Sequence, residues 1–169
     1  MPKISEINGK PEWYMDKLKQ FMKNPLGFYY IAGSNGCGKS FTARALYDCF
    51  VVDDSDDKLF YNMVNLNLDW QRQIKEWGDS LYLLNNIMKT KLLILDDLGT
   101  RRPSDAFMDF LYAIAELRFE SRSTCGTIIT TNLNGEEIRH MFGDAFLSRV
   151  LSGIVVRYDG TDRRLQDFK

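Results

Sequence analysis

The stretch of residues 28–40, FYYIAGSNGCGKS, limits the possible folds of this chain more than any other feature. It begins with aromatic, β-branched and small residues, which predict a short strand ending at Gly33. Glycines recur at 36 and 38, so the backbone can turn tightly and come close to an anion. The N–H groups of such a loop point inward, Lys39 reaches the β- and γ-phosphates, and the Ser40 hydroxyl is placed to bind Mg²⁺. The sequence therefore predicts a phosphate-binding loop.

A helix is expected directly after this loop. Ala43, Leu46, Tyr47 and Phe50 follow the i, i+3, i+4, i+7 spacing of one buried helix face. A phosphate at the start of this helix also gains from its N-terminal dipole. The expected nucleotide contacts are Gly33, Ser34, Asn35, Gly36, Cys37, Gly38, Lys39, Ser40 and Phe41.

Composition limits the domain count and the classes of partner. A chain of 169 residues with 44% apolar residues fits one α/β domain. Its net charge of −1 gives no global basic field, so any contact with DNA must come from a local patch. The three cysteines show no metal spacing, and the chain has no signal peptide or membrane-spanning apolar run. We expect a cytoplasmic protein that does not contact a membrane.

The second informative stretch is KLLILDDLG, residues 91–99. Four consecutive apolar residues predict a strand buried on both faces, and two carboxylates follow where ligands of parallel sheets collect. Asp96 is expected to bind Mg²⁺, and Asp97 to orient or deprotonate the attacking water. The alternative, a strand that merely ends in an acidic turn, is less favoured because Lys39 lies upstream.

The rest of the chain reads as alternating helices and strands. Helices are expected over residues 11–23 and over 66–90, the second interrupted at Gly78, and a strand over about 59–64. Ser104 is suited to cap a helix with an apolar face. A strand over 127–131 ends in Asn132, which either contacts the γ-phosphate or its water, or simply begins a turn; spacing alone leaves both open.

The ordered set GSNGCGKS, LLILDDLGT, TIITTNL, GDAFLSRVLSG and YDGTDRR resembles the AAA+ core of bacterial and phage helicase loaders of the DnaC/DnaI type, and IstB-type transposition ATPases are similar. The resemblance covers roughly residues 25–164. It implies an α/β P-loop fold with a five-stranded parallel sheet flanked by helices. Because the sequence ends soon after Arg164, we expect little or no C-terminal lid. We expect residues 1–24 to form a lead-in and helix, and residues 25–169 to form the ATPase core.

The resemblance also implies roles for single residues. Lys39 and Ser40 match the Walker A motif, and Asp96 and Asp97 match Walker B. Asn132 matches sensor 1, and Arg149 matches the arginine finger offered to the ATP of the next subunit. Arg163 matches the terminal arginine of the loader core. An arginine supplied in trans makes hydrolysis depend on assembly into a homo-oligomer.

Loaders of this family bind single-stranded DNA and a replicative DNA helicase, so both are expected partners. Candidate DNA contacts are Arg72, Lys75, Trp77, Arg101, Arg102 and Ser104. Contact with the helicase would use the helix of residues 11–23 or the AAA+ surface.

Three alternatives stay open at this point. A transposition helper ATPase shares the chemistry but has a transposase as partner. A small nucleoside or nucleotide kinase shares the phosphate loop, although the pair Asp96–Asp97 followed by TIITTN speaks against it. A module that only binds ATP, without turnover, is the third.

Overall fold

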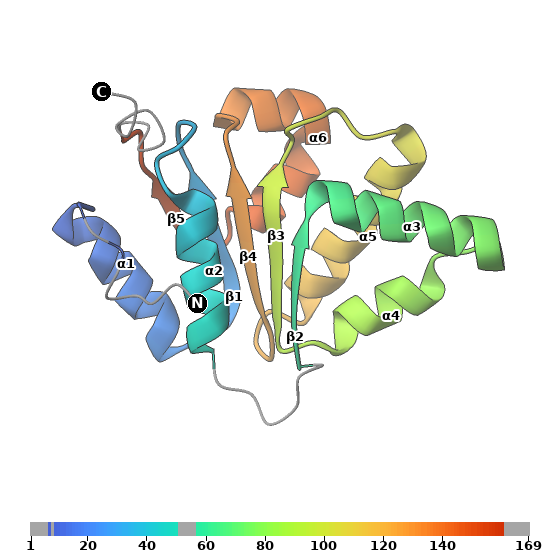
Figure 1. Cartoon of the computed structure of the whole chain (residues 1–169), viewed down its shortest axis with the longest axis horizontal. Coiled ribbons are helices and arrows are strands. Elements are labelled where there is room, and N and C mark those ends of the chain that lie inside the picture. Colours follow the sequence, from blue (N-terminus) through green and yellow to red (C-terminus); the bar gives the residue numbers. More distant parts are fainter. Residues whose placement is uncertain (1–6, 8, 51–56, 161–169) are drawn as a thin grey trace.

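The computed structural model describes residues 7, 9–50 and 57–160. Five parallel strands form one sheet in the order β2-β3-β4-β1-β5 (Figure 1). The strands are β1 (Gly27–Ala32), β2 (Lys58–Asn62), β3 (Leu92–Leu98), β4 (Gly126–Thr131) and β5 (Ile154–Arg157). Because the strands are parallel, all their carboxyl ends lie at one edge of the sheet, where ligands of such sheets bind.

Six helices connect or flank the strands in the described part of the chain. They are α1 (Glu12–Lys23), α2 (Lys39–Cys49), α3 (Met63–Trp77), α4 (Leu81–Lys89), α5 (Asp105–Glu120) and α6 (Gly135–Val150). None of these helices has the length and apolar character that a membrane crossing requires. After β5 the described residues run to Gly160 and contain no further helix.

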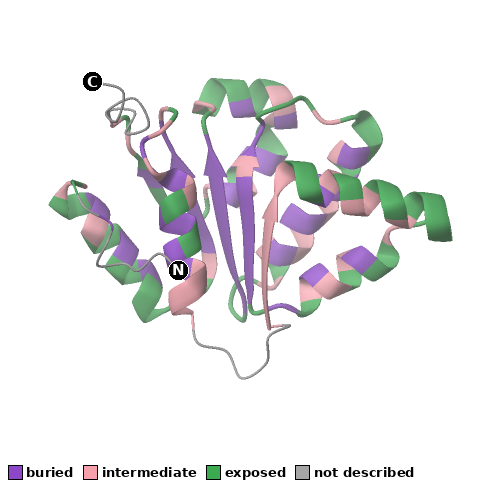
Figure 2. Cartoon of the chain, in the orientation of Figure 1, coloured by how far each residue is buried: buried purple, intermediate pink, exposed green. Residues whose placement is uncertain are grey.

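The sheet is covered on both faces, which explains why its central strands read as continuous apolar runs. Alternate residues of β1 point to opposite faces: Phe28 and Tyr30 pack with α3 to α6, whereas Tyr29 and Ile31 pack with α1 and α2. Figure 2 shows the middle of the sheet as almost entirely buried. The expected α/β P-loop fold with a five-stranded parallel sheet is confirmed.

Helix α1 belongs to the same apolar layer as the phosphate-loop helix. Tyr14, Leu18 and Phe21 are buried on one face, where the Phe21 ring stacks on Tyr29 at 4.9 Å between centroids. The Tyr14 hydroxyl donates a hydrogen bond to Thr42 Oγ1 of α2 over 3.1 Å. These contacts fix α1 against the helix that begins the phosphate site.

One strand–helix boundary differs from the sequence prediction. Strand β2 ends at Asn62 instead of Val64, because the Asn62 side chain accepts a hydrogen bond from Asn65 N and caps α3. The predicted interruption at Gly78 is confirmed, since the left-handed φ of 77° at this glycine ends α3. Helix α6 is kinked at Gly143, whose φ of 78° and ψ of 167° are not helical.

Candidate functional site

The phosphate loop lies between β1 and α2, as the motif requires. Gly38 is the N-cap of α2 with a left-handed φ of 93°, a conformation that side chains with a Cβ rarely adopt. Gly33 is required for a different reason, namely a close approach: a Cβ there would lie 2.0 Å from the Tyr158 carbonyl oxygen. The loop is therefore built against the segment that follows β5.

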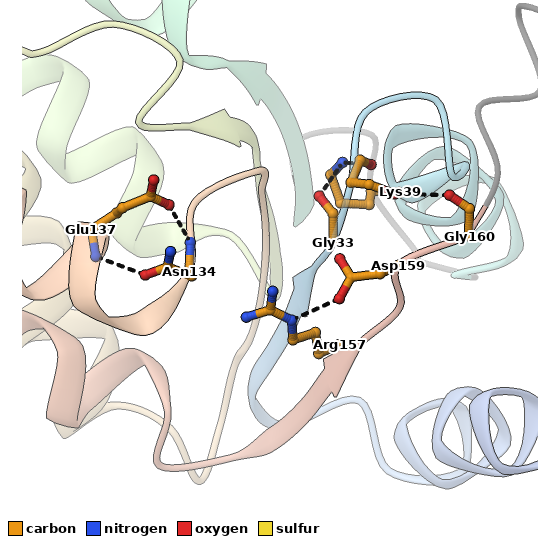
Figure 3. A network of polar contacts seen from close by, with 8 residues as sticks. Gly33, Lys39, Asn134, Glu137, Arg157, Asp159 and Gly160 are labelled. Atoms are coloured by element: carbon orange, nitrogen blue, oxygen red, sulfur yellow. Dashed lines mark hydrogen bonds and ion pairs between the residues drawn. The ribbon is translucent and has the colours of Figure 1, made fainter.

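Lys39 is the first residue of α2 and is buried, with 6% of its surface exposed. Its Nζ donates hydrogen bonds to two carbonyl oxygens of its own loop, to Gly33 over 3.0 Å and to Ser34 over 2.8 Å. The ammonium group is thus held inside the curve of the loop, close to the N-terminus of α2 (Figure 3). A cation that lies beside the free N–H groups at a helix N-terminus favours a phosphate ligand.

Asp96 reaches the same edge from β3. It is buried, and its carboxylate accepts hydrogen bonds from Thr130 Oγ1 over 2.6 Å and from the Ser40 side chain. Burial raises the pKa of this carboxyl, while the hydrogen bonds of Thr130 and Ser40 oppose the rise. A buried carboxylate beside a serine hydroxyl is a hard oxygen pair of the kind that Mg²⁺ prefers.

Ser40 and Asp96 fit a metal ion whose remaining coordination positions are filled by a bound ligand and water. Among the residues that the structure describes, no group of three or more acidic, histidine or cysteine side chains is placed to hold a metal. Mg²⁺ in phosphate-binding sites takes one or two protein ligands and otherwise phosphate oxygens and water. Ser40 and Asp96 therefore suit Mg²⁺ bound together with a nucleotide.

Asp97 has an unusual backbone, with a φ of 63° that is the one positive value among the described non-glycine residues. The register between β3 and β4 shifts at this point. Asp97 N–H donates to Thr130 Oγ1 over 2.9 Å, and its carbonyl accepts from Thr100 Oγ1 over 2.9 Å. Positive φ in a non-glycine residue costs about 1–2 kcal/mol and is often retained at functional sites.

Asn132 follows the last residue of β4 and is exposed. Thr131 pairs with Ala32 of β1 on one side and with Leu98 of β3 on the other. The end of β4 is therefore flanked by the strands that carry the phosphate loop and the two acidic residues. Asn132 is thus held at the carboxyl edge of the sheet, between those two motifs.

Arg149 makes its contacts inside its own subunit. Its guanidinium forms an ion pair with Glu116 of α5, and Nη1 donates to the Ala145 carbonyl over 2.8 Å. Its Nε is buried and has no hydrogen-bond partner in the described part of the chain. The structure thus places Arg149 against α5, and the role of arginine finger needs a second subunit. Arg163 lies outside the described residues.

The candidate DNA contacts fall into two groups. Arg72, Lys75 and Trp77 lie on the second half of α3, where Trp77 is 72% exposed and Arg72 forms an ion pair with Asp69. The other group lies in the loop from β3 to α5, and there Ser104 caps α5 by accepting from Phe107 N over 3.3 Å.

A pocket of about 280 Å³ lies between the first half of α3 and the loop from β3 to α5. Asp97, Arg101, Arg102 and Ser104 line it, together with polar residues of α3 such as Asn67. The arginine pair and the second acidic residue therefore share one pocket, and the group on the second half of α3 does not line it.

The segment after β5 contributes residues that sequence reasoning did not single out. Ser34 Oγ donates to the Gly160 carbonyl over 2.8 Å, and Arg157 pairs with Asp159 over 2.9 Å beside the loop (Figure 3). The Arg157 guanidinium lowers the pKa of the Asp159 carboxyl, with smaller help from Ser34 and Lys39. A carboxylate thus lies next to the phosphate loop. Thr130 was also missed, since threonine is common in strands.

The comparisons with known proteins agree with this fold. The family model for IstB-like ATP-binding proteins matches residues 23–158. The structure of the DnaC helicase loader aligns with a TM-score of 0.80 at 20% identity, over 94% of this chain and 97% of that one. The structure of DnaI aligns with a TM-score of 0.73 at 17% identity, over 92% of this chain and 89% of that one.

A replication initiator has the same fold over part of its length. The structure of DnaA bound to AMPPCP and single-stranded DNA aligns with a TM-score of 0.79 at 16% identity, over 99% of this chain and 55% of that one. This chain thus spans about half the length of that protein. A search of curated protein sequences finds no significant match. The family model covers most of the chain, and the protein therefore belongs to the family of IstB-like ATP-binding proteins.

Proposed function

We propose that this protein is a Mg²⁺-dependent ATPase of DNA replication that loads a replicative helicase onto single-stranded DNA in the cytoplasm. The observation that carries the proposal is the meeting of Lys39, Ser40 and Asp96 at the carboxyl edge of the sheet. The fold similarity to the DnaC helicase loader over nearly the whole of both chains supports the choice of loader. Family membership favours this ATPase over a nucleoside kinase.

Each residue of the site has a proposed task in hydrolysis. Lys39 exchanges the carbonyls of Gly33 and Ser34 for the β- and γ-phosphates of ATP. Ser40 and Asp96 would hold Mg²⁺, which would neutralise the charge that develops on the phosphates. Asp97 orients or deprotonates the attacking water.

Asn132 and Arg149 complete the proposed site from two directions. Asn132, at the end of β4, contacts the γ-phosphate or the water. Arg149 leaves Glu116 and stabilises the transition-state charge on the ATP of a neighbouring subunit. Hydrolysis then depends on assembly, so an isolated subunit turns ATP over slowly. Arg163 is proposed to contact the nucleotide as well.

Single-stranded DNA is proposed to bind along α3 and the loop from β3 to α5. Trp77 offers an exposed ring for base stacking, and Arg72, Lys75, Arg101 and Arg102 offer charges for phosphates. Arg101 and Arg102 share their pocket with Asp97, which supports a link between DNA contact and hydrolysis. ATP then favours the assembled, DNA-bound state, and hydrolysis releases it.

A second candidate is a transposition helper ATPase, and the match to the IstB-like family model favours it. The two candidates share every catalytic role and differ in the protein that is bound. Binding assays with a purified hexameric replicative helicase and with a transposase separate them. Binding to the helicase alone supports the loader, and binding to the transposase alone supports the helper.

The experiment that tests the proposal measures single-stranded DNA binding with and without AMPPCP and Mg²⁺. For the wild-type protein we expect nucleotide to tighten binding of a labelled oligonucleotide by about tenfold or more. Lys39→Ala removes the buried ammonium group and should abolish this increase, whereas Lys17→Ala, at an exposed position of α1, should keep it. Unchanged nucleotide-dependent affinity in Lys39→Ala would contradict the proposal.

A further inference from the structure

Thr130 lies in β4, the neighbour of β3, and its side chain contacts both acidic residues of that strand. It is fully buried, and its hydroxyl makes two hydrogen bonds at once. It donates to Asp96 Oδ1 over 2.6 Å and accepts from the Asp97 N–H over 2.9 Å. A hydroxyl has one hydrogen and two lone pairs, so both bonds can form together. One oxygen atom thus connects β4 to both acidic residues.

The first bond holds the Asp96 carboxylate in one orientation. Asp96 is buried, and Thr130 and Ser40 approach its carboxylate from β4 and from α2. A hydrogen bond to a buried carboxylate is stronger than a bond between neutral groups. With one oxygen tied to Thr130, the carboxylate keeps its position beside Ser40.

The second bond holds the backbone of Asp97. A φ of 63° is unfavourable for an aspartate, and the strand register shifts at the same place. The Asp97 N–H is bonded to Thr130, and its carbonyl is bonded to Thr100. The bond from β4 therefore opposes relaxation of Asp97 to the ordinary strand conformation, which would turn its side chain away.

We propose that Thr130 is a positioning residue for ATP hydrolysis, which sets Asp96 beside Ser40 and fixes the left-handed backbone of Asp97. The inference rests on the proposed ATPase function. Groups that orient metal ligands commonly change metal affinity or activity by about 10–100-fold when they are removed. The role needs the hydroxyl of Thr130 and does not need its methyl group.

The chain offers a matched set of variants. Thr130→Val keeps the shape and removes the hydroxyl, whereas Thr130→Ser keeps the hydroxyl. Thr131→Val is the control, because Thr131 is the adjacent, equally buried threonine whose hydroxyl donates to the Leu98 carbonyl over 2.7 Å. Thr131 therefore bonds β3 without contacting either carboxylate.

The first test needs no nucleotide and measures amide hydrogen exchange by NMR. We expect the Asp97 amide to exchange about tenfold faster or more in Thr130→Val than in the wild-type protein. In Thr130→Ser and in Thr131→Val the rate should stay within about threefold of the wild-type rate. An Asp97 amide that exchanges at the wild-type rate in Thr130→Val overturns the inference, whatever the protein hydrolyses.

The second test measures binding of a fluorescent ATP analogue during a Mg²⁺ titration, and turnover in parallel. Thr130→Val should bind the analogue in EDTA like the wild-type protein, need about tenfold more Mg²⁺ for half-maximal effect, and show at least about tenfold lower kcat. Thr130→Ser should restore both values. Equal losses in Thr130→Val and Thr130→Ser, or a wild-type Mg²⁺ requirement in Thr130→Val, overturn the inference alone. A wild-type protein that binds no nucleotide overturns the proposed function and the inference with it.

Discussion

At the scale of single residues, Asp97 combines a proposed chemical role with a strained backbone. Its φ of 63° suits asparagine almost as well as aspartate, because both tolerate the left-handed region better than other residues with a Cβ. Asp97→Asn therefore removes the charge without adding backbone strain. Asp97→Ala removes the charge and also adds strain.

We predict that Asp97→Asn lowers ATP turnover by about 10²–10⁴-fold while ATP binding and stability are retained, because the side chain loses its proton-accepting group. Asp97→Ala should lose turnover equally and should also lower the free energy of unfolding by about 1 kcal/mol. Single-turnover kinetics and urea unfolding measure the two effects. Basal turnover in Asp97→Asn equal to that of the wild-type protein would refute the role given to Asp97.

Arg118 is a second residue that matters alone, and its task is structural. It is fully buried at the end of α5, and no carboxylate pairs with it in the hydrogen bonds that fix it. Its guanidinium instead donates to Thr127 Oγ1 over 2.9 Å, to the Thr90 carbonyl over 2.7 Å, and to the carbonyls of Ile87 and Gly126. Burial lowers the pKa of Arg118. One side chain of α5 thereby connects the N-terminal end of β4 to the C-terminal end of α4.

We predict that Arg118→Met lowers the free energy of unfolding by about 3 kcal/mol or more, because several buried acceptors lose their donor. Arg122→Met is the matched control, since Arg122 is exposed and its side chain contacts Phe119 of its own turn, donating to the carbonyl and lying over the ring at 4.1 Å. It should change the stability by less than about 0.5 kcal/mol. Equal stabilities of the two variants in urea unfolding would show that the Arg118 network contributes little.

The sequence predicted part of the site because some residues are fixed by local spacing. The phosphate loop and the acidic pair follow strands directly, so their positions at the carboxyl edge could be predicted from the motifs alone. Thr130, Asp159 and Arg118 could not be predicted, because their roles depend on contacts between segments distant in the sequence, such as the 33-residue separation of Asp97 and Thr130. Arg118 also falls on the face of α5 where an apolar residue is expected.

At the scale of elements, the pairing of α5 with α6 determines where Arg149 points. Glu116 of α5 holds the guanidinium within the subunit, so the proposed role of Arg149 at the ATP of a neighbouring subunit would require this ion pair to open. Both side chains are partly exposed, at 28% for Arg149 and 44% for Glu116. Such pairs contribute only about 0–1 kcal/mol, so the pair is weak enough to exchange for a phosphate.

We predict that Glu116→Gln raises assembly-dependent turnover by up to about fivefold at limiting protein concentration, because less energy is needed to free Arg149. Arg149→Ala should abolish the assembly-dependent part and leave the slow basal rate. The measurement is turnover against protein concentration. If Glu116→Gln loses turnover as Arg149→Ala does, Glu116 is instead a residue that positions the arginine finger.

Mixing Arg149→Ala with Asp97→Asn should rescue turnover, because one of the shared sites then contains both an intact Asp97 and an intact Arg149.

Element boundaries were predictable only where a capping residue is not next to residues that suit both a strand and a helix. The helical pattern over residues 66–90 was correct in type, and its interruption at Gly78 follows from the glycine. The junction of β2 and α3 was misplaced by two residues, because Met63 and Val64 suit a strand as well as a helix. The local hydrogen bond from Asn65 N to the Asn62 side chain, which caps α3, decided the boundary.

At the scale of the whole molecule, buried tyrosines make the free energy of unfolding decrease at high pH. Burial raises the pKa of Tyr14 and Tyr30 to about 12, and it raises the pKa of Tyr29 further. A tyrosine whose pKa is raised in the folded state stabilises fully below its unfolded pKa near 10. This stability is lost as the pH rises from 10 toward 12.

We predict that the free energy of unfolding of the wild-type protein falls, relative to that of Tyr30→Phe, by about 1 kcal/mol between roughly pH 9 and pH 11. Phenylalanine cannot ionise, so the variant lacks this contribution. Tyr82→Phe is the control, since Tyr82 is 66% exposed and should leave the pH dependence unchanged. Parallel curves for the wild-type protein and Tyr30→Phe in urea unfolding would contradict the raised pKa.

The whole fold was more predictable than the assembly. Composition and the alternation of apolar strands with amphipathic helices indicated one α/β domain, and the resemblance carried by the ordered motifs implied the five-stranded parallel sheet that the structure shows. The arrangement of subunits would depend on surfaces such as the one around Arg149. For these surfaces the sequence motifs identify single residues and do not predict how the surfaces fit together. Within one subunit this arginine pairs with Glu116, so the geometry of the proposed shared site would be determined by assembly.

The most direct test of the central claim is light scattering coupled to size-exclusion chromatography, with and without AMPPCP, Mg²⁺ and a single-stranded oligonucleotide. An ATP-driven loader should change from monomer to multimer only when nucleotide and DNA are both present, and Lys39→Ala should remain a monomer. A wild-type protein that stays monomeric under every condition would contradict the assembly-dependent ATPase.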